Sequence, residues 1–212
     1  MTTEQLIQRL TERLAPLSSR AIDTRMAMLV TAGIALTLLC VLLGFGARAD
    51  LAQALLTFPF WLKWAYAGLL CGLASVMALR LARPGAKPLS PWWISIPVGA
   101  LAVLAALELA HSPTSQWREL WLGHSALYCP ERIALLSIPN TAGIFIALRN
   151  LAPTRLRSTG ATAALAAGAC AAVLYGLACD EVSGVFVLTW YSLGIGLSAA
   201  IGALIGPWFL RW

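Results

Sequence analysis

The sequence predicts an all-α, polytopic membrane protein with six transmembrane helices, and three observations predict it. First, 59% of the 212 residues are hydrophobic and 11% are charged, whereas a soluble domain carries about 25% charged residues. Second, the mean hydropathy is +0.78, so the chain cannot cover itself with polar surface and needs a bilayer as its solvent. Third, six apolar stretches are long enough to cross a bilayer, which takes roughly 20 helical residues.

The expected spans cover about residues 26–46, 58–81, 92–110, 130–149, 160–178 and 185–210, within one membrane domain, residues 26–212. Pro97 and Pro139 are expected to kink the third and fourth spans. Small residues recur every four positions in the last two spans, a pattern typical of faces that pack closely against another helix. These residues are Gly160, Ala164, Gly168, Ala172 and Gly176, followed by Ser198, Gly202 and Gly206.

The distribution of Lys and Arg predicts that both termini are cytoplasmic. Eleven of the 15 basic residues fall on the side that carries the termini: Arg9, Arg13, Arg20, Arg25, Arg80, Arg83, Lys87, Arg149, Arg155, Arg157 and Arg211. Four fall on the opposite side: Arg48, Lys63, Arg118 and Arg132. Loops rich in Lys and Arg remain in the cytoplasm, so the second side is expected to face outward.

Residues 1–25 are predicted to be a short cytoplasmic amphipathic segment. Thr2 and Gln5 fit a capping box at the start of a helix, and Pro16 is expected to end or kink that helix. Apolar residues follow the cap at near-helical spacing: Leu6, Ile7, Leu10, Leu14 and Leu17. A helix this short is marginal alone in water, so we expect it to bind either the membrane surface or another protein.

Five cysteines divide into two groups. Cys40, Cys71 and Cys170 lie within spans, where a thiol behaves as a small apolar residue. Cys129 and Cys179 lie at the outward-facing ends of the fourth and fifth spans, which are neighbours in the sequence. Three roles remain open for this pair: a structural disulfide, a reversible sensor of oxidation or of a soft metal, or two independent thiols.

A metal site at this edge would combine the two cysteines with other ligands. His124, Glu131 and Asp180 are the main candidates, and Glu181 and His111 could support them. Thiolate with imidazole suits soft or borderline cations. The sequence has no C-x-x-C and no H-x-x-x-H motif, so spacing gives this site little support. Acidic neighbours should raise the pKa of both thiols unless a cation such as Arg132 lies close.

Lys63 and Glu108 are the charged residues nearest the membrane interior. Each lies about one helical turn inside the outer edge of its span, and charges at such depth usually pair or reach for the interface. We therefore expect a structural ion pair between the second and third spans. Ionisable residues near the midplane, which a proton relay would need, are not evident.

Several segments resemble the NrsF-type membrane anti-sigma factor family, formerly a domain of unknown function. They are FWLKWAY, LWLGHS with YCPERIALLSIPN, LRNLAPTRLRSTGATAALAAGA, CDEVSGVFVLTWYSLGIG and the terminal LRW. The resemblance extends from about Leu6 to Trp212. It implies a multi-pass protein of the bacterial inner membrane that sequesters an extracytoplasmic-function sigma factor. It also implies that Cys129 and Cys179 are periplasmic and sense metal or oxidant stress.

From the resemblance and the amphipathic pattern together, Leu6, Ile7, Arg9, Leu10, Arg13 and Leu14 are expected to bind the sigma factor. The protein is expected to be no enzyme, to contact the lipid bilayer and no nucleic acid directly, and to hold no cofactor beyond a transient soft or borderline metal ion. Two alternatives remain: a membrane thiol-disulfide oxidoreductase and a small-solute transporter. The missing C-x-x-C motif counts against the first, and the lack of a clear inverted repeat counts against the second.

Overall fold

The computed structural model describes residues 3–5, 19–83, 85–151 and 153–211, and for residues 19–23 it describes the backbone alone. Within these ranges the regular elements are helices and no strand occurs. Six helices are long and apolar enough to cross a membrane. The predicted fold class and the predicted number of spans are therefore confirmed.

The first five spans are α2 (Ser19–Gly44), α4 (Phe58–Ala82), α5 (Trp92–His111), α7 (Cys129–Arg149) and α8 (Leu156–Tyr175). The sixth span is a continuous helix made of α9 (Gly184–Phe186), the π-helical turn η2 (Val187–Tyr191) and α10 (Ser192–Phe209). Short helices lie in the connections: α3 (Leu51–Ala54), η1 (Thr114–Gln116) and α6 (Trp117–Leu122).

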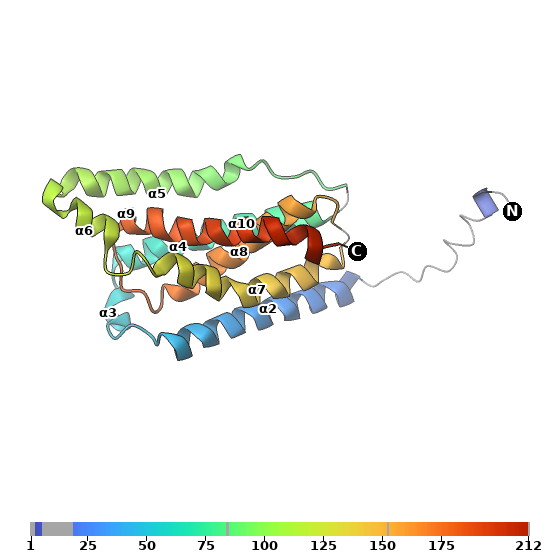
Figure 1. The fold of residues 1–212 in the computed structure, drawn as a ribbon, viewed down its shortest axis with the longest axis horizontal. Coiled ribbons are helices and arrows are strands. Elements are labelled where there is room, and N and C mark those ends of the chain that lie inside the picture. Colours follow the sequence, from blue (N-terminus) through green and yellow to red (C-terminus); the bar gives the residue numbers. More distant parts are fainter. Residues whose placement is uncertain (1–2, 6–18, 84, 152, 212) are drawn as a thin grey trace.

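The spans run alongside one another, so that each end of the bundle collects alternate connections (Figure 1). The start of α2 and the end of α10 lie at one end, which we call the terminal end. The helices α3 and α6 lie at the other end, which we call the thiol end. The fifth span begins and ends earlier than predicted, since α8 stops at Tyr175. Cys179 therefore lies in the loop that follows α8.

Helix α8 is the centre of the bundle. It packs against α10, α4 and α7, and it is the most buried of the six spans. Helix α2 packs chiefly on α7, while α5 packs on α4 and on α9. Both are the least buried spans, so their remaining faces are available to lipid.

Glycines allow α8 and α10 to approach to backbone contact, as the small-residue pattern predicted. A Cβ atom on Gly168 would lie 2.9 Å from the Cβ of Ser198, and one on Gly206 would lie 2.7 Å from the carbonyl oxygen of Leu156. A Cβ atom on Gly202 would overlap the side chain of Ala164 and the backbone of Gly160. In lipid, close van der Waals packing of this kind replaces the hydrophobic effect between helices.

A second close approach joins α2 to α7. A Cβ atom on Gly143 would lie 2.6 Å from the carbonyl oxygen of Leu29. Pro139 lies inside α7 and cannot donate a backbone hydrogen bond. Close to it, the hydroxyl of Thr37 donates to the carbonyl oxygen of Leu136 over 3.2 Å, so α2 supplies a polar contact beside the weakened turn of α7.

Gly202→Leu should destabilise the bundle strongly, because the new side chain has no room between α8 and α10. Overpacking typically costs about 1–3 kcal/mol, and here the obstructing atoms include backbone. Gly196→Leu on the same helix is the matched control, since nothing lies within 4 Å of the position where its Cβ would be. Thermal unfolding in detergent should show a lower midpoint for the first variant alone. Equal midpoints would contradict the close packing.

Candidate functional site

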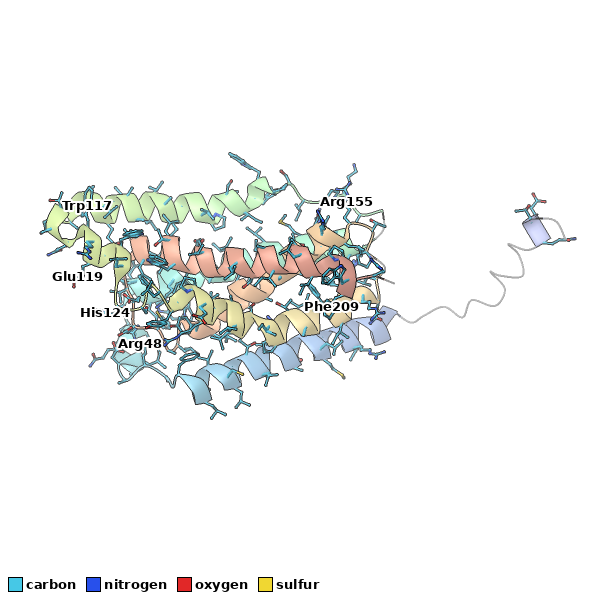
Figure 2. All side chains as sticks on the ribbon, viewed as in Figure 1. Arg48, Trp117, Glu119, His124, Arg155 and Phe209 are labelled. Carbon is cyan, nitrogen blue, oxygen red and sulfur yellow. The ribbon has the colours of Figure 1, made fainter. Side chains whose placement is uncertain are left out.

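The site lies at the thiol end, where the loop after α8 meets the start of α7. We call residues 176–183 the Cys179 loop. Figure 2 shows Arg48 and His124 at this end, with Arg155 and Phe209 at the opposite end. Cys129 and Cys179 are 0% and 3% exposed, are not joined by a disulfide, and hydrogen-bond to each other through their thiols. The structure thus brings the two predicted cysteines together.

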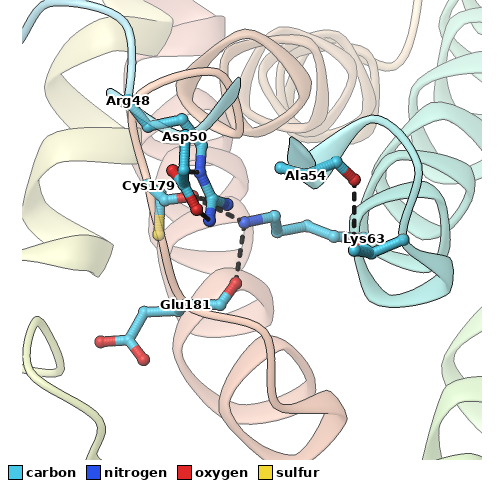
Figure 3. Close-up of polar contacts among 7 residues, drawn as sticks. Arg48, Asp50, Ala54, Lys63, Cys179 and Glu181 are labelled. Atoms are coloured by element: carbon cyan, nitrogen blue, oxygen red, sulfur yellow. Dashed lines mark hydrogen bonds and ion pairs between the residues drawn. The ribbon is translucent and has the colours of Figure 1, made fainter. Parts of the chain in front are cut away.

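Lys63 reaches the same loop from α4. Its side chain is 2% exposed, and its Nζ donates to the carbonyl oxygens of Cys179 and Glu181, each over 2.9 Å (Figure 3). Among the described residues, no carboxylate lies within ion-pair distance of this ammonium group. The predicted ion pair with Glu108 is therefore wrong. Lys63 is satisfied by main-chain carbonyls, because the Cys179 loop passes directly over the end of its side chain.

Glu108 also binds this part of the chain, although not Lys63. Its Oε2 accepts hydrogen bonds from the hydroxyl of Ser183 over 3.3 Å and from the backbone N–H of Val185 over 3.2 Å. These groups belong to the start of the sixth span, where unpaired N–H groups attract negative charge. The two charges that the sequence paired with each other therefore bind different points of one segment.

Glu181 joins the Cys179 loop to the turn that precedes α7. Its side chain is 8% exposed, and Oε1 accepts from the backbone N–H of His124 over 2.6 Å and from the N–H and hydroxyl of Ser125, both over 3.0 Å. Gly123 has φ +50°, and a Cβ there would overlap this carboxylate. The turn therefore needs glycine both for its backbone conformation and for the space that Glu181 occupies.

Arg48 supplies a second cation to the loop from the connection after α2. Its guanidinium binds Asp50 through Nε over 2.6 Å and through Nη2 over 2.7 Å. This hydrogen bonding lowers the pKa of the exposed Asp50 carboxyl. Nη1 donates to the carbonyl oxygen of Cys179 over 3.3 Å. The main chain at Cys179 is therefore held by both Lys63 and Arg48 (Figure 3).

The surroundings of Cys179 favour its thiolate. The pKa of Cys179 is lowered to about 6, and the hydrogen bond from the Cys129 thiol is the largest influence. The charge of Lys63, the hydroxyl of Tyr191 and the backbone N–H of Glu181 act in the same direction, against the opposing effect of burial. Thiolates are the reactive form of cysteine. The acidic neighbours that the sequence suggested as unfavourable to a thiolate do not decide its pKa.

The predicted cation Arg132 lies beside the pair but binds elsewhere. Its guanidinium stacks over the ring of Phe45, 4.8 Å from the centroid, and donates to the hydroxyl of Tyr175 over 3.2 Å. Lys63, and not Arg132, is the cation that helps to lower the pKa of Cys179. The signal that could have found it was the presence of a lysine inside a span, with no acidic residue one helical turn away.

The five predicted metal ligands are not assembled. Cys129 and Cys179 meet, but the side chains of His124, Glu131 and Asp180 are exposed. The described part of the chain contains no group of three or more His, Cys, Asp or Glu side chains that could hold a metal ion. Residues two apart on a helix do not share a face, so Glu131 points away from Cys129 and instead lines an apolar groove between α7 and α10.

Two further outcomes concern the remaining predicted residues. The predicted sigma-binding residues, Leu6, Ile7, Arg9, Leu10, Arg13 and Leu14, lie outside the residues that the structure describes. Cys71 and Cys170, expected to be apolar filler, hydrogen-bond to each other between α4 and α8. No sequence pattern indicates this contact, because it depends on how the two helices are rotated against each other.

Comparison with known proteins places the whole chain in one family. The family profile described as "Negative regulator of sigma F" matches residues 10–212. The chain belongs to this family. A protein of Azospira oryzae named "Probable anti-sigma-F factor NrsF" is 37% identical over 213 residues, and one of Caulobacter vibrioides named "Anti-sigma-F factor NrsF" is 40% identical over 215 residues. Both alignments cover 100% of each protein, and no solved structure matches the chain.

In this member of the negative regulators of sigma F, three features of the thiol end were not predicted from the sequence. They are the main-chain contacts of Lys63, the buried carboxylate of Glu181, and the π-helical turn that carries Tyr191. A π-helical turn widens the helix locally and is frequent at functional sites. The Tyr191 side chain is 0% exposed and faces Cys179, but its hydroxyl has no full hydrogen bond among the described residues.

Glu181→Ala should loosen the thiol end, because the backbone N–H groups of His124 and Ser125 would lose their acceptor. Leaving such a group unsatisfied costs about 1–3 kcal/mol. Asp180→Ala is the matched control, since that side chain is exposed. Unfolding in mixed dodecyl sulfate micelles, together with protease cleavage between residues 122 and 128, should separate the two variants. Identical behaviour would show that the Glu181 contacts do not order the turn.

Proposed function

We propose that this protein is a membrane-bound anti-sigma factor that sequesters an extracytoplasmic-function sigma factor and releases it when the Cys129–Cys179 pair is oxidised. Full-length similarity to two proteins named as anti-sigma-F factors carries the first part. The buried contact between two free thiols supports the second part. Oxidation is favoured over metal capture because no third ligand accompanies the thiols among the described residues.

The charge distribution supports a cytoplasmic location for the termini and an outward location for the thiols. The helix ends and connections at the terminal end carry most of the basic residues, including Arg80, Arg149 and Arg155. The thiol end carries Arg48, Lys63, Arg118 and Arg132. By the positive-inside rule, the sigma factor would bind at the terminal end, in the cytoplasm. The thiols would face the oxidising side, where disulfides persist.

The amino-terminal segment is our candidate for the sigma-binding surface. Leu6, Ile7, Leu10 and Leu14 would supply an apolar face, and Arg9 and Arg13 would meet acidic groups on the sigma factor. An isolated helix of this length is marginal, so it would gain its order on binding. Binding of this kind can be switched by a modest change in the presentation of the segment.

Oxidation would change the thiol end by a definite movement. Two thiols and one peroxide give one disulfide, one water molecule and one alcohol or second water molecule. The sulfur atoms then move from hydrogen-bond contact to a bond of about 2 Å. Cys179 cannot move alone, because Lys63 and Arg48 bind its carbonyl oxygen and Glu181 fixes the next turn. The strain would therefore pass to α4, α7 and α8.

The switch would need a bundle with two arrangements of different affinity for the sigma factor. Moving a population from 1:99 to 99:1 takes about 5.5 kcal/mol of differential free energy. Helix α8 runs from the Cys179 loop to the terminal end and contacts α4, α7 and α10. A shift of α8 would reach the connections at the terminal end without involving the lipid-facing helix α5.

A thiol-disulfide oxidoreductase is the alternative that a specific observation favours, since one thiol of a pair with a lowered pKa is typical of that class. The burial of both sulfur-bearing side chains opposes it, because a protein dithiol would have no route to them. Turnover of a reduced protein substrate by the purified protein would favour this alternative.

The double variant Cys129→Ser/Cys179→Ser should still sequester the sigma factor but should no longer release it under peroxide, because the disulfide cannot form. Co-purification of the sigma factor from membranes, with and without peroxide, measures both properties. Cys40→Ser is the control, since that thiol is exposed on α2. Release from the double variant that matches the parent protein would exclude the cysteine pair as the trigger.

Removal of residues 1–20 should release the sigma factor constitutively, because the proposed apolar contact would be lost. A carboxy-terminal tag should show that the shortened protein reaches the membrane in normal amount. Sigma-dependent transcription should then be high without stress. Repression that persists in the shortened protein would assign the main contact to the cytoplasmic connections instead.

A further inference from the structure

A buried ammonium group without an anionic partner marks the thiol end. Lys63 is 2% exposed, and the carbonyl oxygens of Cys179 and Glu181 occupy two of its three donors. Among the described residues, no carboxylate lies within 4 Å of its Nζ. A buried charge is strongly unfavourable unless an opposite charge compensates it, and carbonyl dipoles compensate it only in part. Both thiols are close enough for their charge to act on Lys63, and Cys179 acts more strongly than Cys129.

We propose that Lys63 is the positioning residue that makes Cys179 the attacking thiol of the pair and leaves Cys129 as the resolving thiol. This inference rests on the proposed redox function and specifies how its first step is controlled. Lys63 itself forms no bond to the oxidant. Its ammonium group stabilises the Cys179 thiolate, and its two hydrogen bonds fix the main chain that carries this sulfur (Figure 3).

The other groups around Cys179 support the same assignment. The Cys129 thiol donates to Cys179, and the backbone N–H of Glu181 and the hydroxyl of Tyr191 also face it. The ring of Tyr191 lies under the ammonium group of Lys63, 5.7 Å from Nζ to the centroid. The Tyr191 hydroxyl has no hydrogen-bond partner among the described residues, so a thiolate at Cys179 would supply the missing acceptor.

Other charged groups near the Cys179 loop have partners of their own or are exposed. Arg48 binds Asp50 and the Cys179 carbonyl oxygen. Arg132 donates to the hydroxyl of Tyr175. The Glu181 carboxylate accepts from His124 and Ser125. Asp180 is exposed. Lys63 is the buried cation of the group, and its charge acts on Cys179 without a carboxylate partner among the described residues.

The chemistry follows in two balanced steps with a peroxide as the oxidant. The Cys179 thiolate attacks the terminal oxygen of the peroxide, the O–O bond breaks, and the leaving oxygen takes a proton to give water or an alcohol. Cys179 then bears a sulfenic acid. The Cys129 thiol attacks this sulfur, the S–O bond breaks, and water leaves as the disulfide forms. Overall, two thiols are oxidised and one peroxide is reduced.

The test is the pH profile of alkylation in the full-length protein in membranes, without sigma factor. A small alkylating reagent, iodoacetamide, is applied between pH 5 and 9, and peptide mass spectrometry follows each cysteine. In the parent protein, Cys179 should react before Cys129, with a midpoint near the pKa of about 6. The thiolate is the reacting form, so the midpoint reports the group that Lys63 is proposed to stabilise.

Lys63→Met should move this midpoint to above pH 7 and slow the reaction of Cys179 at pH 6.5 by about five- to tenfold. Lys63→Arg should restore most of the parent profile, because it keeps the charge. Arg118→Met is the control, since that exposed cation lies at the same end without touching the loop. A purely structural role of Lys63 would change the rate at every pH without moving the midpoint.

Three results would overturn the inference: the same midpoint in Lys63→Met and the parent, a shifted midpoint in Lys63→Arg as large as in Lys63→Met, or modification of Cys129 before Cys179 in the parent. The last result needs no variant and decides the question even where Lys63→Met does not fold. Because no sigma factor takes part, a normal alkylation profile with no peroxide-driven release would reject the proposed function and leave the role of Lys63 intact.

Discussion

The thiol end of this bundle depends on one buried ammonium group. A charge at the depth of Lys63 is costly unless the protein surrounds it with partners, and here the partners are two carbonyl oxygens of the Cys179 loop. Satisfying the charge therefore dictates the path of the loop. That path places Cys179 beside Cys129, and the same loop gains Arg48 and Glu181 as further attachments.

Close helix packing connects the thiol end to the terminal end. Gly160, Gly202 and Gly206 bring α8 and α10 to backbone contact, and packed elements of this kind shift as units between discrete arrangements. Helix α8 is central, and it begins near the terminal end and finishes at the Cys179 loop. A movement of the loop therefore acts on the most connected helix of the protein.

Lys63 and Glu108 show where prediction from the sequence succeeds and where it stops. The sequence placed each of them inside a span and near the thiol end, because this position follows from the bounds of an apolar run. It paired them wrongly, because each one's partner belongs to a segment more than 70 residues away. The prediction that Glu131 joins the cysteines in a metal site is wrong for a local reason. Residues two apart on a helix lie on different faces, so Glu131 does not share the face of Cys129. Glu181, which the sequence offered only as a supporting metal ligand, is the buried carboxylate of the site.

The sequence by itself determined that the helices need a lipid environment and that there are six spans, because both depend on local sums of transfer free energy. It also determined the small-residue faces and the family, because both depend on residue identity along the chain. The tertiary structure alone decided which partner each buried charge has, that the two thiols touch, that Cys71 meets Cys170, and that a π-helical turn presents Tyr191 to Cys179. These contacts depend on helix rotation and loop path, which are fixed by the packing of the whole bundle and leave no periodic trace in the residues themselves.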